Sequence, residues 1–118
     1  KNNSLENNIK VVSFKKNIYP FYKKSDLYIL SSIYEGLPNT LLEANTFGLK
    51  IFSTDCKTGP REILNKLKYN PFFKIRDYKN LSQKILYLNK YKKKKFNYDK
   101  RFDFNLNVIK YKQIINSL

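Results

Sequence analysis

Residues 27–53 read LYILSSIYEGLPNTLLEANTFGLKIFS, and this stretch lays out a strand, a loop, a helix and a second strand. Residues 27–30 form a near-continuous apolar run, which is typical of a strand buried on both faces of a sheet. The apolar positions of residues 40–47 recur at helical spacing, and Gly48 is placed to end that helix in the left-handed conformation. Residues 50–53 supply the next strand. This order predicts a right-handed βαβ unit and therefore a parallel sheet.

The segments on either side continue the alternation of strands and helices. Residues 9–14 are predicted to form a short strand, because they are a short run rich in β-branched residues. Pro20 is placed to open a helix over residues 18–24, which turns Phe21 and Tyr22 inward. Further elements are predicted downstream: a helix over residues 61–66, a short strand within 70–75, and helices over 80–91 and 104–118. The pattern predicts an α/β fold, a Rossmann-like parallel sheet with flanking helices.

The composition excludes several kinds of catalytic site. The 118 residues include no His and one Cys, so the usual zinc sites, Ser-His-Asp triads and Cys-His dyads cannot form. Cys56 is expected to be a small, buried, reduced thiol. No apolar run approaches the roughly 18–20 residues that a membrane-spanning helix needs. Any chemistry therefore depends on carboxylates, backbone amides, cations and bound ligands.

The formal net charge of +15 suggests a polyanionic partner such as nucleic acid, a phosphate-bearing ligand or an anionic membrane surface. The alternative is compositional bias, because Lys, Asn, Ile, Tyr and Phe are all frequent together. Only 3 of the 24 cations are Arg, and the scarcity of Arg favours bias over specific phosphate recognition. Two other functions stay open at this point: a basic nucleic-acid-binding module whose aromatic residues stack on bases, and a degenerate, non-catalytic scaffold domain.

Two carboxylates, Glu35 and Glu43, flank a turn at the carboxyl end of the strand 27–30, where parallel sheets bind ligands. The helix N-terminus at Asn39 and Thr40 offers free backbone amides to a phosphate. The two carboxylates would then bracket a molecule with a phosphate in its middle and hydroxyls at both ends, such as a nucleotide sugar. The alternative is a capping box, in which Asn39 or Thr40 caps the helix, Glu43 turns back to the cap amide, and Glu35 is merely solvated.

Three quoted stretches resemble the retaining glycosyltransferases of family 4, which have the GT-B fold. YEGLPNTLLEA, at residues 34–44, resembles the E-x₇-E motif of that family. FKKNIYPFYKKSDLYILSS, at residues 14–32, is similar to its glycine-phenylalanine turn, helix and strand. STDCKTGPREIL, at residues 53–64, is similar to a loop of bacterial members that build surface glycans. The resemblance implies that residues 1–118 are a partial C-terminal nucleotide-sugar-binding domain, the N-terminally truncated C-terminal half of a GT-B fold, with residues 91–118 as a link and helix.

The resemblance also implies a role for each residue of the motif. Glu35 would lie near the donor sugar as the catalytic carboxylate, and Glu43 would bind the ribose hydroxyls. The residues between them would bind the sugar and the diphosphate, and these donor-binding residues are Gly36, Leu37, Pro38, Asn39 and Thr40. Arg61 is a candidate phosphate contact, with a surface ion pair as the alternative. No metal and no cofactor is expected, because helix amides and basic side chains replace the metal and the nucleotide sugar is a substrate.

The implied activity is retaining transfer of a hexose-type sugar to a glycan or lipid-linked acceptor in bacterial polysaccharide biosynthesis. A cytoplasmic location is expected, with peripheral contact at the inner face of the membrane through the basic residues 92–95 as an open alternative. Two departures from the family matter. Ser13 stands where the family usually has Gly, and the family's diphosphate-neutralising Arg and Lys, with its acceptor domain, lie upstream of this segment. We therefore expect part of a longer enzyme, inactive by itself.

Overall fold

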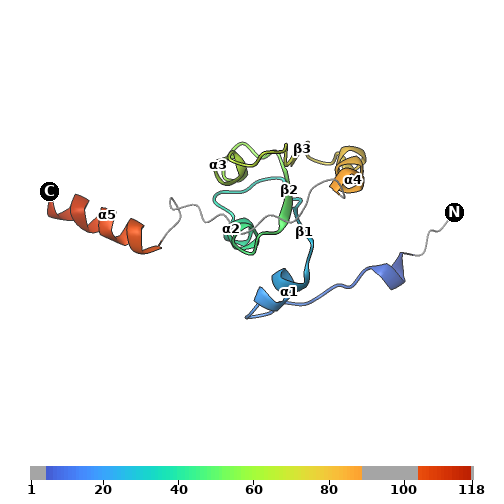
Figure 1. Cartoon of the computed structure of the whole chain (residues 1–118), viewed down its shortest axis with the longest axis horizontal. Coiled ribbons are helices and arrows are strands. Elements are labelled where there is room, and N and C mark those ends of the chain that lie inside the picture. Colours follow the sequence, from blue (N-terminus) through green and yellow to red (C-terminus); the bar gives the residue numbers. More distant parts are fainter. Residues whose placement is uncertain (1–4, 89–103, 118) are drawn as a thin grey trace.

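The computed structural model describes residues 5–88 and 104–117, and its centre is a three-stranded parallel sheet (Figure 1). The central strand, β2 (Lys50–Thr54), pairs with β1 (Leu27–Leu30) on one side and with β3 (Phe72–Phe73) on the other. The α/β class and the parallel, Rossmann-like sheet predicted from the sequence are therefore confirmed, as are the three strands from β1 onward.

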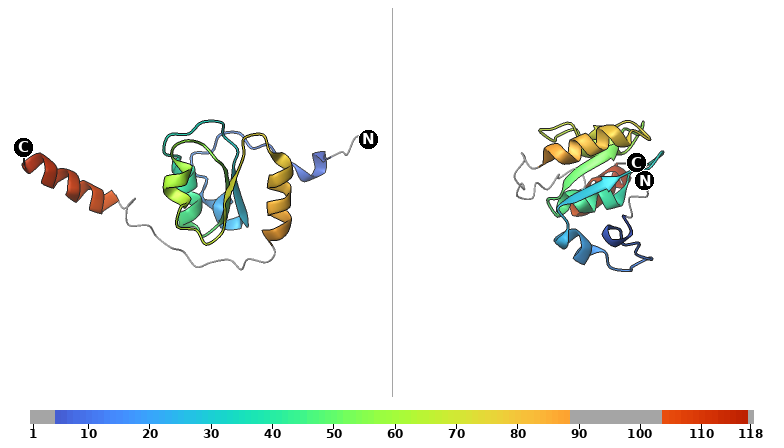
Figure 2. Two further views of the ribbon diagram at one scale, coloured as in Figure 1. Left: turned by 90° about the horizontal axis from the view of Figure 1, so that it is seen from above. Right: turned by 90° about the vertical axis from the view of Figure 1, so that its right-hand side faces the viewer.

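Helices cover both faces of this sheet. Figure 2 shows α2 and α4 on opposite sides of the strands, and Figure 1 shows α5 well apart from them. The helices are η1 (Glu6–Asn8), α1 (Tyr19–Lys24), α2 (Asn39–Thr46), α3 (Pro60–Leu64), α4 (Tyr78–Tyr87) and α5 (Phe104–Asn116). The predicted helices are thus found with shifted ends, while the predicted link after residue 91, including the basic residues 92–95, lies outside the described residues.

The larger core lies between the sheet and the helices α2 and α3. Side chains alternate between the faces of a strand, so Leu30 of β1 and Ile51 of β2 point toward the same side. There they meet Leu41 and Ala44 of α2, both fully buried, and Leu64 of α3. The helical spacing read from the sequence therefore does select the buried face of α2. Gly48 ends this helix with a φ of 69°, as predicted.

The smaller core lies on the opposite face, under α4. Its buried residues are Phe52 of β2, Phe73 of β3 and Leu88 at the end of α4, and it extends to Leu27. It does not reach Ile29, whose side chain is 38% exposed although it follows the same face as Phe52. The prediction that β1 is buried on both faces is wrong at this position, because the core under α4 does not extend over Ile29 of the edge strand β1.

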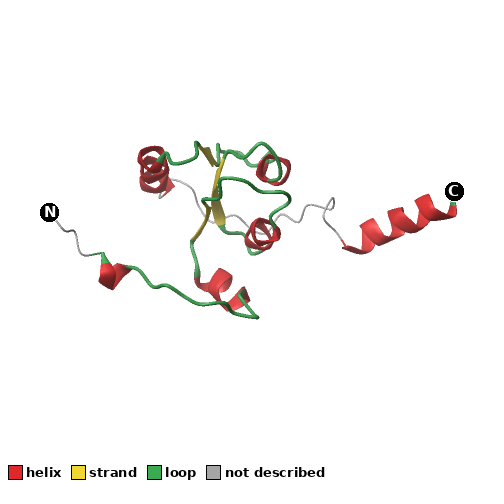
Figure 3. Ribbon diagram, turned by 180° about the vertical axis from the view of Figure 1, so that it is seen from behind, coloured by secondary structure: helices red, strands yellow, loops and turns green. Residues whose placement is uncertain are grey.

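The predicted strand over residues 9–14 does not form. Figure 3 shows this segment as an extended loop that runs past α1, and every one of its side chains is exposed, Phe14 at 92%. A strand needs a neighbour for its backbone groups as well as a β propensity. Within the described residues, positions 10–14 make no backbone–backbone hydrogen bond. In α1 the expectation is half right, since Tyr22 is buried while Phe21 is 47% exposed.

The loops that follow β1 and β2 pack directly against each other. We call them the β1 loop, residues 31–38, and the β2 loop, residues 55–59. Gly59, at the end of the β2 loop, has a φ of 78°, which side-chain-bearing residues rarely adopt. A Cβ atom at Gly59 would lie 1.7 Å from the carbonyl oxygen of Gly36 in the β1 loop. The backbones approach so closely that only glycine fits at this position.

This contact predicts a large difference between two glycine substitutions. Gly59→Ala should lower the free energy of unfolding by at least about 2 kcal/mol, because it combines a left-handed φ with a backbone clash. Gly36→Ala is the matched control, since a Cβ there meets no atom within 4 Å. It should change the free energy of unfolding by less than about 1 kcal/mol. Urea denaturation of both variants measures this, and equal losses would contradict the packing described.

Candidate functional site

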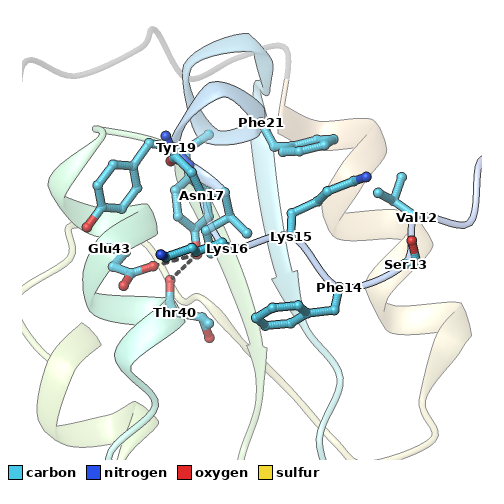
Figure 4. Close-up of a pocket in the computed structure, with 12 residues that line it drawn as sticks. Val12, Ser13, Phe14, Lys15, Lys16, Asn17, Tyr19, Phe21, Thr40 and Glu43 are labelled. Carbon is cyan, nitrogen blue, oxygen red and sulfur yellow. Dashed lines mark hydrogen bonds between the residues drawn. The ribbon is translucent and has the colours of Figure 1, made fainter.

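A cavity of about 660 Å³ opens beside the N-terminus of α2 (Figure 4). Residues 12–19, with Phe21 and Tyr22, line one side, and Thr40 and Glu43 of α2 line the other. The Lys16 side chain extends toward Thr40 and Glu43 in Figure 4. The cavity therefore combines a helix N-terminus, a carboxylate, a cation and exposed aromatic surface. We call it the α2 cavity.

Tyr22 supports Glu43 from beneath this cavity. Its side chain is 6% exposed, and its hydroxyl lies 3.2 Å from Glu43 Oε2 and 3.2 Å from the carbonyl oxygen of Thr40, so its single O–H is shared between these two acceptors. Burial, followed by the charge of Glu43 and this hydrogen bond, raises the pKa of Tyr22 well above its usual value. The phenol therefore stays protonated and fixes one oxygen of the carboxylate.

A second tyrosine, Tyr28 of β1, binds Thr40 and lies within the electrostatic influence of both carboxylates of the motif. Its hydroxyl donates to Thr40 Oγ1 over 2.8 Å. Burial raises the pKa of Tyr28, the hydrogen bond to Thr40 lowers it in part, and the charges of Glu35 and Glu43 raise it further. Both carboxylates thus act electrostatically on one phenol, although they are eight positions apart in the sequence.

These contacts contradict the capping-box interpretation. The N-cap residue of α2 is Pro38, and α2 has no side-chain cap hydrogen bond. Neither Asn39 nor Thr40 acts as the cap, because both lie within the helix. The hydroxyl of Thr40 is engaged by Tyr28 and the carboxylate of Glu43 by Tyr22. The side chains of Thr40 and Glu43 are directed to the tyrosines and the cavity, not to the helix end.

The β1 loop is held by side chains from the end of β2 and from the β2 loop. Thr54 Oγ1 donates to the carbonyl oxygen of Ser32, and Thr58 Oγ1 donates to that of Glu35 over 2.7 Å. The thiol of Cys56 donates to the carbonyl of Ser32 at a sulfur–oxygen distance of 3.4 Å. Cys56 is 2% exposed, so its prediction as a buried loop thiol is confirmed. These bonds fix the backbone that carries Glu35.

The structure therefore brings together only some of the predicted site residues. Thr40 and Glu43 line the α2 cavity, whereas Glu35 is half-buried in the β1 loop and is not among the lining residues. Of the residues between Glu35 and Thr40, Pro38 is buried, and the other three, Gly36, Leu37 and Asn39, are exposed. The predicted roles of all these residues in donor binding stay predictions.

Arg61 forms the ion pair that the sequence left open as an alternative to a phosphate contact. Its Nε and Nη2 donate to the two carboxylate oxygens of Asp55, over 2.7 Å and 2.6 Å. These bonds raise the pKa of Arg61. Arg61 does not line the α2 cavity. In the described part of the chain, no group of three or more His, Cys, Asp or Glu residues is arranged to hold a metal ion.

Sequence reasoning missed the tyrosines as part of the site. It expected Tyr22 to face the core and gave Tyr28 no role beyond an apolar strand. A signal was present, because a buried tyrosine hydroxyl needs a hydrogen-bond partner and the chain has few carboxylates to offer.

Among the described residues, none of the helices combines the length and the apolar character that a membrane-spanning segment requires.

Comparison with known proteins identifies the family. Residues 1–103 match the family described as glycosyl transferases group 1, and the chain belongs to this family. It is 51% identical over 61 residues to an uncharacterized glycosyltransferase of Methanocaldococcus jannaschii. The matched segment covers 52% of this chain and 15% of that relative. It is 43% identical over 60 residues to an amylovoran biosynthesis glycosyltransferase of Erwinia amylovora, covering 51% of this chain and 17% of that relative.

A third relative carries a more specific name. The chain is 30% identical over 60 residues to the N-acetylgalactosamine-N,N'-diacetylbacillosaminyl-diphospho-undecaprenol 4-alpha-N-acetylgalactosaminyltransferase of Campylobacter jejuni, covering 51% of this chain and 16% of that relative. The matched segment is thus a small part of each relative's length. No solved structure matches the chain. Fold and family together define a glycosyltransferase domain.

The support of Glu43 by Tyr22 predicts a pH-dependent loss of stability. The folded pKa of Tyr22 lies above the unfolded value of 10.0, so the unfolded chain loses this proton first as the pH rises. The stabilising contribution is therefore complete below about pH 10 and declines above it. Tyr22→Phe should lower the free energy of unfolding by about 1–3 kcal/mol near neutral pH and make its decline in alkali shallower.

Denaturant midpoints at about pH 8 and about pH 11 measure both effects. The control is Tyr78→Phe, because the Tyr78 side chain is 73% exposed, and it should follow the unmodified chain at both values. Equal alkaline declines in the unmodified chain and in Tyr22→Phe would show that Tyr22 does not contribute in this way.

Proposed function

We propose that this chain is the C-terminal, donor-binding domain of a family 4 retaining glycosyltransferase with the GT-B fold. It binds a nucleotide-diphosphate sugar for retaining transfer of a hexose-type sugar. The observation that carries the proposal is the α2 cavity, in which Thr40 and Glu43 at a helix N-terminus face Lys16 and the exposed ring of Phe14. Membership of the glycosyl transferases group 1 family supports it.

The cavity offers complementary groups for each part of such a donor. Within the described residues, the backbone amides of Asn39 and Thr40 make no backbone hydrogen bond. Together with the positive end of the α2 dipole, they attract a phosphate. Lys16 adds a positive charge on the opposite wall. Tyr22 occupies Glu43 Oε2, so Oε1 is left to accept from ribose hydroxyls. The exposed face of Phe14 suits a nucleobase.

The β1 loop would position the donor sugar. Its residues Gly36, Leu37 and Pro38 join the phosphate end of α2 to Glu35, which we propose contacts the donor sugar. Because Thr54 binds the carbonyl of Ser32 and Thr58 binds the carbonyl of Glu35 itself, the backbone that carries this carboxylate is held before the donor arrives. Such preorganisation lowers the cost of orienting a group toward charge that develops in the transition state.

We further propose that the acceptor is a glycan or a lipid-linked glycan, in bacterial polysaccharide biosynthesis at the cytoplasmic side of the membrane. The name of the Campylobacter relative, which includes diphospho-undecaprenol, supports the lipid-linked class. A nucleic-acid module fits the structure less well, because several aromatic residues contact one another. The rings of Tyr19 and Tyr22 lie 5.5 Å and 5.4 Å from the ring of Phe47.

The role of Glu43 predicts a coupling between this carboxylate and the ribose. Glu43→Gln should weaken UDP binding to the chain by about tenfold, because an amide offers one acceptor oxygen and no charge. The unmodified chain should prefer UDP to 2′-deoxy-UDP, and Glu43→Gln should abolish most of that preference. Isothermal titration of both nucleotides with both proteins completes the cycle.

The matched control for this experiment is Glu6→Gln, which makes the same chemical change at an exposed residue of η1, outside the α2 cavity. It should change UDP affinity by less than about twofold. An undiminished preference for UDP over 2′-deoxy-UDP in a folded Glu43→Gln variant would remove Glu43 from the ribose site.

The role of Glu35 predicts a different kinetic signature in an active enzyme that contains this chain. Glu35→Ala should lower kcat by more than it raises the donor KM, because the contact to the sugar strengthens as the glycosidic bond breaks. Glu43→Ala should mainly raise the donor KM. Steady-state assays with varied donor separate the two, and a pure KM effect at Glu35 would contradict its catalytic role.

A further inference from the structure

The hydrogen bond between Tyr28 and Thr40 involves a hydroxyl group of the α2 cavity that the donor role above does not use. Tyr28 lies on β1 and is half-buried, while Thr40 lies in the first turn of α2, is exposed and lines the cavity. Tyr28 Oη lies 2.8 Å from Thr40 Oγ1. The donor site as proposed uses only the backbone amide of Thr40, so its side chain and the bond to Tyr28 are left without a role.

The phenol is the donor in this bond. Because a phenol is more acidic than an aliphatic alcohol, Tyr28 is the stronger hydrogen-bond donor of the two. Burial and two nearby carboxylates raise the pKa of Tyr28, while its bond to Thr40 lowers it in part, so the phenol keeps its proton at neutral pH. Thr40 Oγ1 therefore accepts, and one of its two lone pairs is taken.

The hydrogen of the Thr40 hydroxyl remains available. In the same helix, Thr46 Oγ1 donates to the carbonyl oxygen of Leu42 over 2.9 Å, which is a common use of a threonine hydroxyl inside a helix. Thr40 is only the second residue of α2, so the carbonyl four residues earlier belongs to Gly36 in the β1 loop, outside the helix. Thr40 Oγ1 donates no hydrogen bond to any of the residues that the structure describes. Its O–H is therefore left to donate to a ligand in the cavity.

Two tyrosines thus prepare two groups of opposite polarity, one turn apart on α2. The ring centres of Tyr22 and Tyr28 lie 6.0 Å apart in an edge-to-face arrangement, so each ring restrains the other. Tyr22 fixes Glu43, whose remaining oxygen accepts. Tyr28 fixes Thr40, whose hydroxyl donates. A nucleotide presents the complementary pair, because its ribose hydroxyls can donate whereas its phosphate oxygens accept.

We propose that Tyr28 is a positioning residue for the diphosphate of the sugar donor: it holds the Thr40 hydroxyl so that its O–H donates to a phosphate oxygen. The inference rests on the proposed function and deepens it, because that function assigns the diphosphate to backbone amides and to Lys16. The hydroxyl adds a donor at little cost in side-chain entropy, since Tyr28 restrains it before the ligand arrives. Hydrogen bonds to a charged acceptor are also the stronger kind.

The test compares UDP with uridine, which lacks the phosphates, by amide-resolved NMR titration of the chain. Thr40→Val should lower UDP affinity at least about fivefold, and Tyr28→Phe, which keeps the ring and its packing, about threefold to fivefold. Uridine affinity should change by less than about twofold in both variants, because uridine has no phosphate to accept from Thr40. The double variant should bind UDP within about twofold of Thr40→Val, because Tyr28 acts only through that hydroxyl.

Two control variants accompany these. Thr40→Ser keeps the hydroxyl and should retain UDP affinity within about twofold. Tyr78→Phe removes a phenol hydroxyl from a side chain that is 73% exposed and lies outside the α2 cavity. It should leave the affinities for UDP and for uridine within about twofold of those of the unmodified chain.

Several results would overturn the proposal. Equal weakening of UDP and uridine by Tyr28→Phe would show that Tyr28 acts only through the shape of the cavity. Unchanged UDP affinity in Thr40→Val or in Tyr28→Phe, or additive losses in the double variant, would contradict the positioning role. Absence of UDP binding to the unmodified chain would contradict the donor site and this inference together. Normal UDP binding that these variants do not alter would contradict only the inference, so the two failures are distinguishable.

Discussion

The contact between the loops after β1 and β2 is the constraint on which the rest of the site depends. Gly59 approaches the carbonyl of Gly36 so closely that no side chain fits between them. Before this contact in the sequence, Thr54 and Thr58 bind the carbonyls of Ser32 and Glu35 in the β1 loop. These contacts restrict the conformation of the β1 loop without help from a ligand. That conformation sets where Glu35 lies and where α2 begins.

The tyrosines extend this order from the backbone to the side chains. Tyr22 comes from α1 and Tyr28 from β1, yet both hydroxyls reach the first turns of α2. A carboxylate that is half-buried in a low-dielectric environment is costly unless its oxygens accept hydrogen bonds. Tyr22 meets part of that cost for Glu43, and leaves part of the carboxylate free to accept from a ligand. Structural support and binding capacity therefore coexist in one side chain.

Much of the fold could be predicted from the sequence, because local patterns decide it. The apolar runs of β1 and β2, the helical spacing of α2 and Gly48 at its end all follow short-range rules. The errors concern long-range partners. Residues 9–14 have strand propensity but no neighbouring strand among the described residues, and Ile29 lies beyond the reach of α4. No local pattern carries that information.

For the candidate site, as for the fold, the sequence predicts local placement and not long-range partners. The positions of Glu35 and Glu43 follow from the strand–loop–helix pattern, whereas the capping box was a reasonable local inference that tertiary contacts override. Thr40 bonds to Tyr28, twelve residues away, and Glu43 bonds to Tyr22, 21 residues away. The choice of Arg61 between a phosphate and Asp55 also depends on packing, since Phe72 from β3 supports the guanidinium.

The topology explains why one small sheet carries two unlike cavities at one edge, the α2 cavity and a cavity of about 400 Å³ at the carboxyl ends of β2 and β3. Each parallel strand is followed by a loop and then by the N-terminus of a helix, so every strand delivers polar groups to the same side. At β1 these groups meet α1 and its preceding loop, which add aromatic rings and lysines. At β2 and β3 they meet one another, and carboxylates pair with cations. The polar and aromatic groups at each cavity are thus set by the element that faces the strand end, while the sheet sets the edge at which they gather.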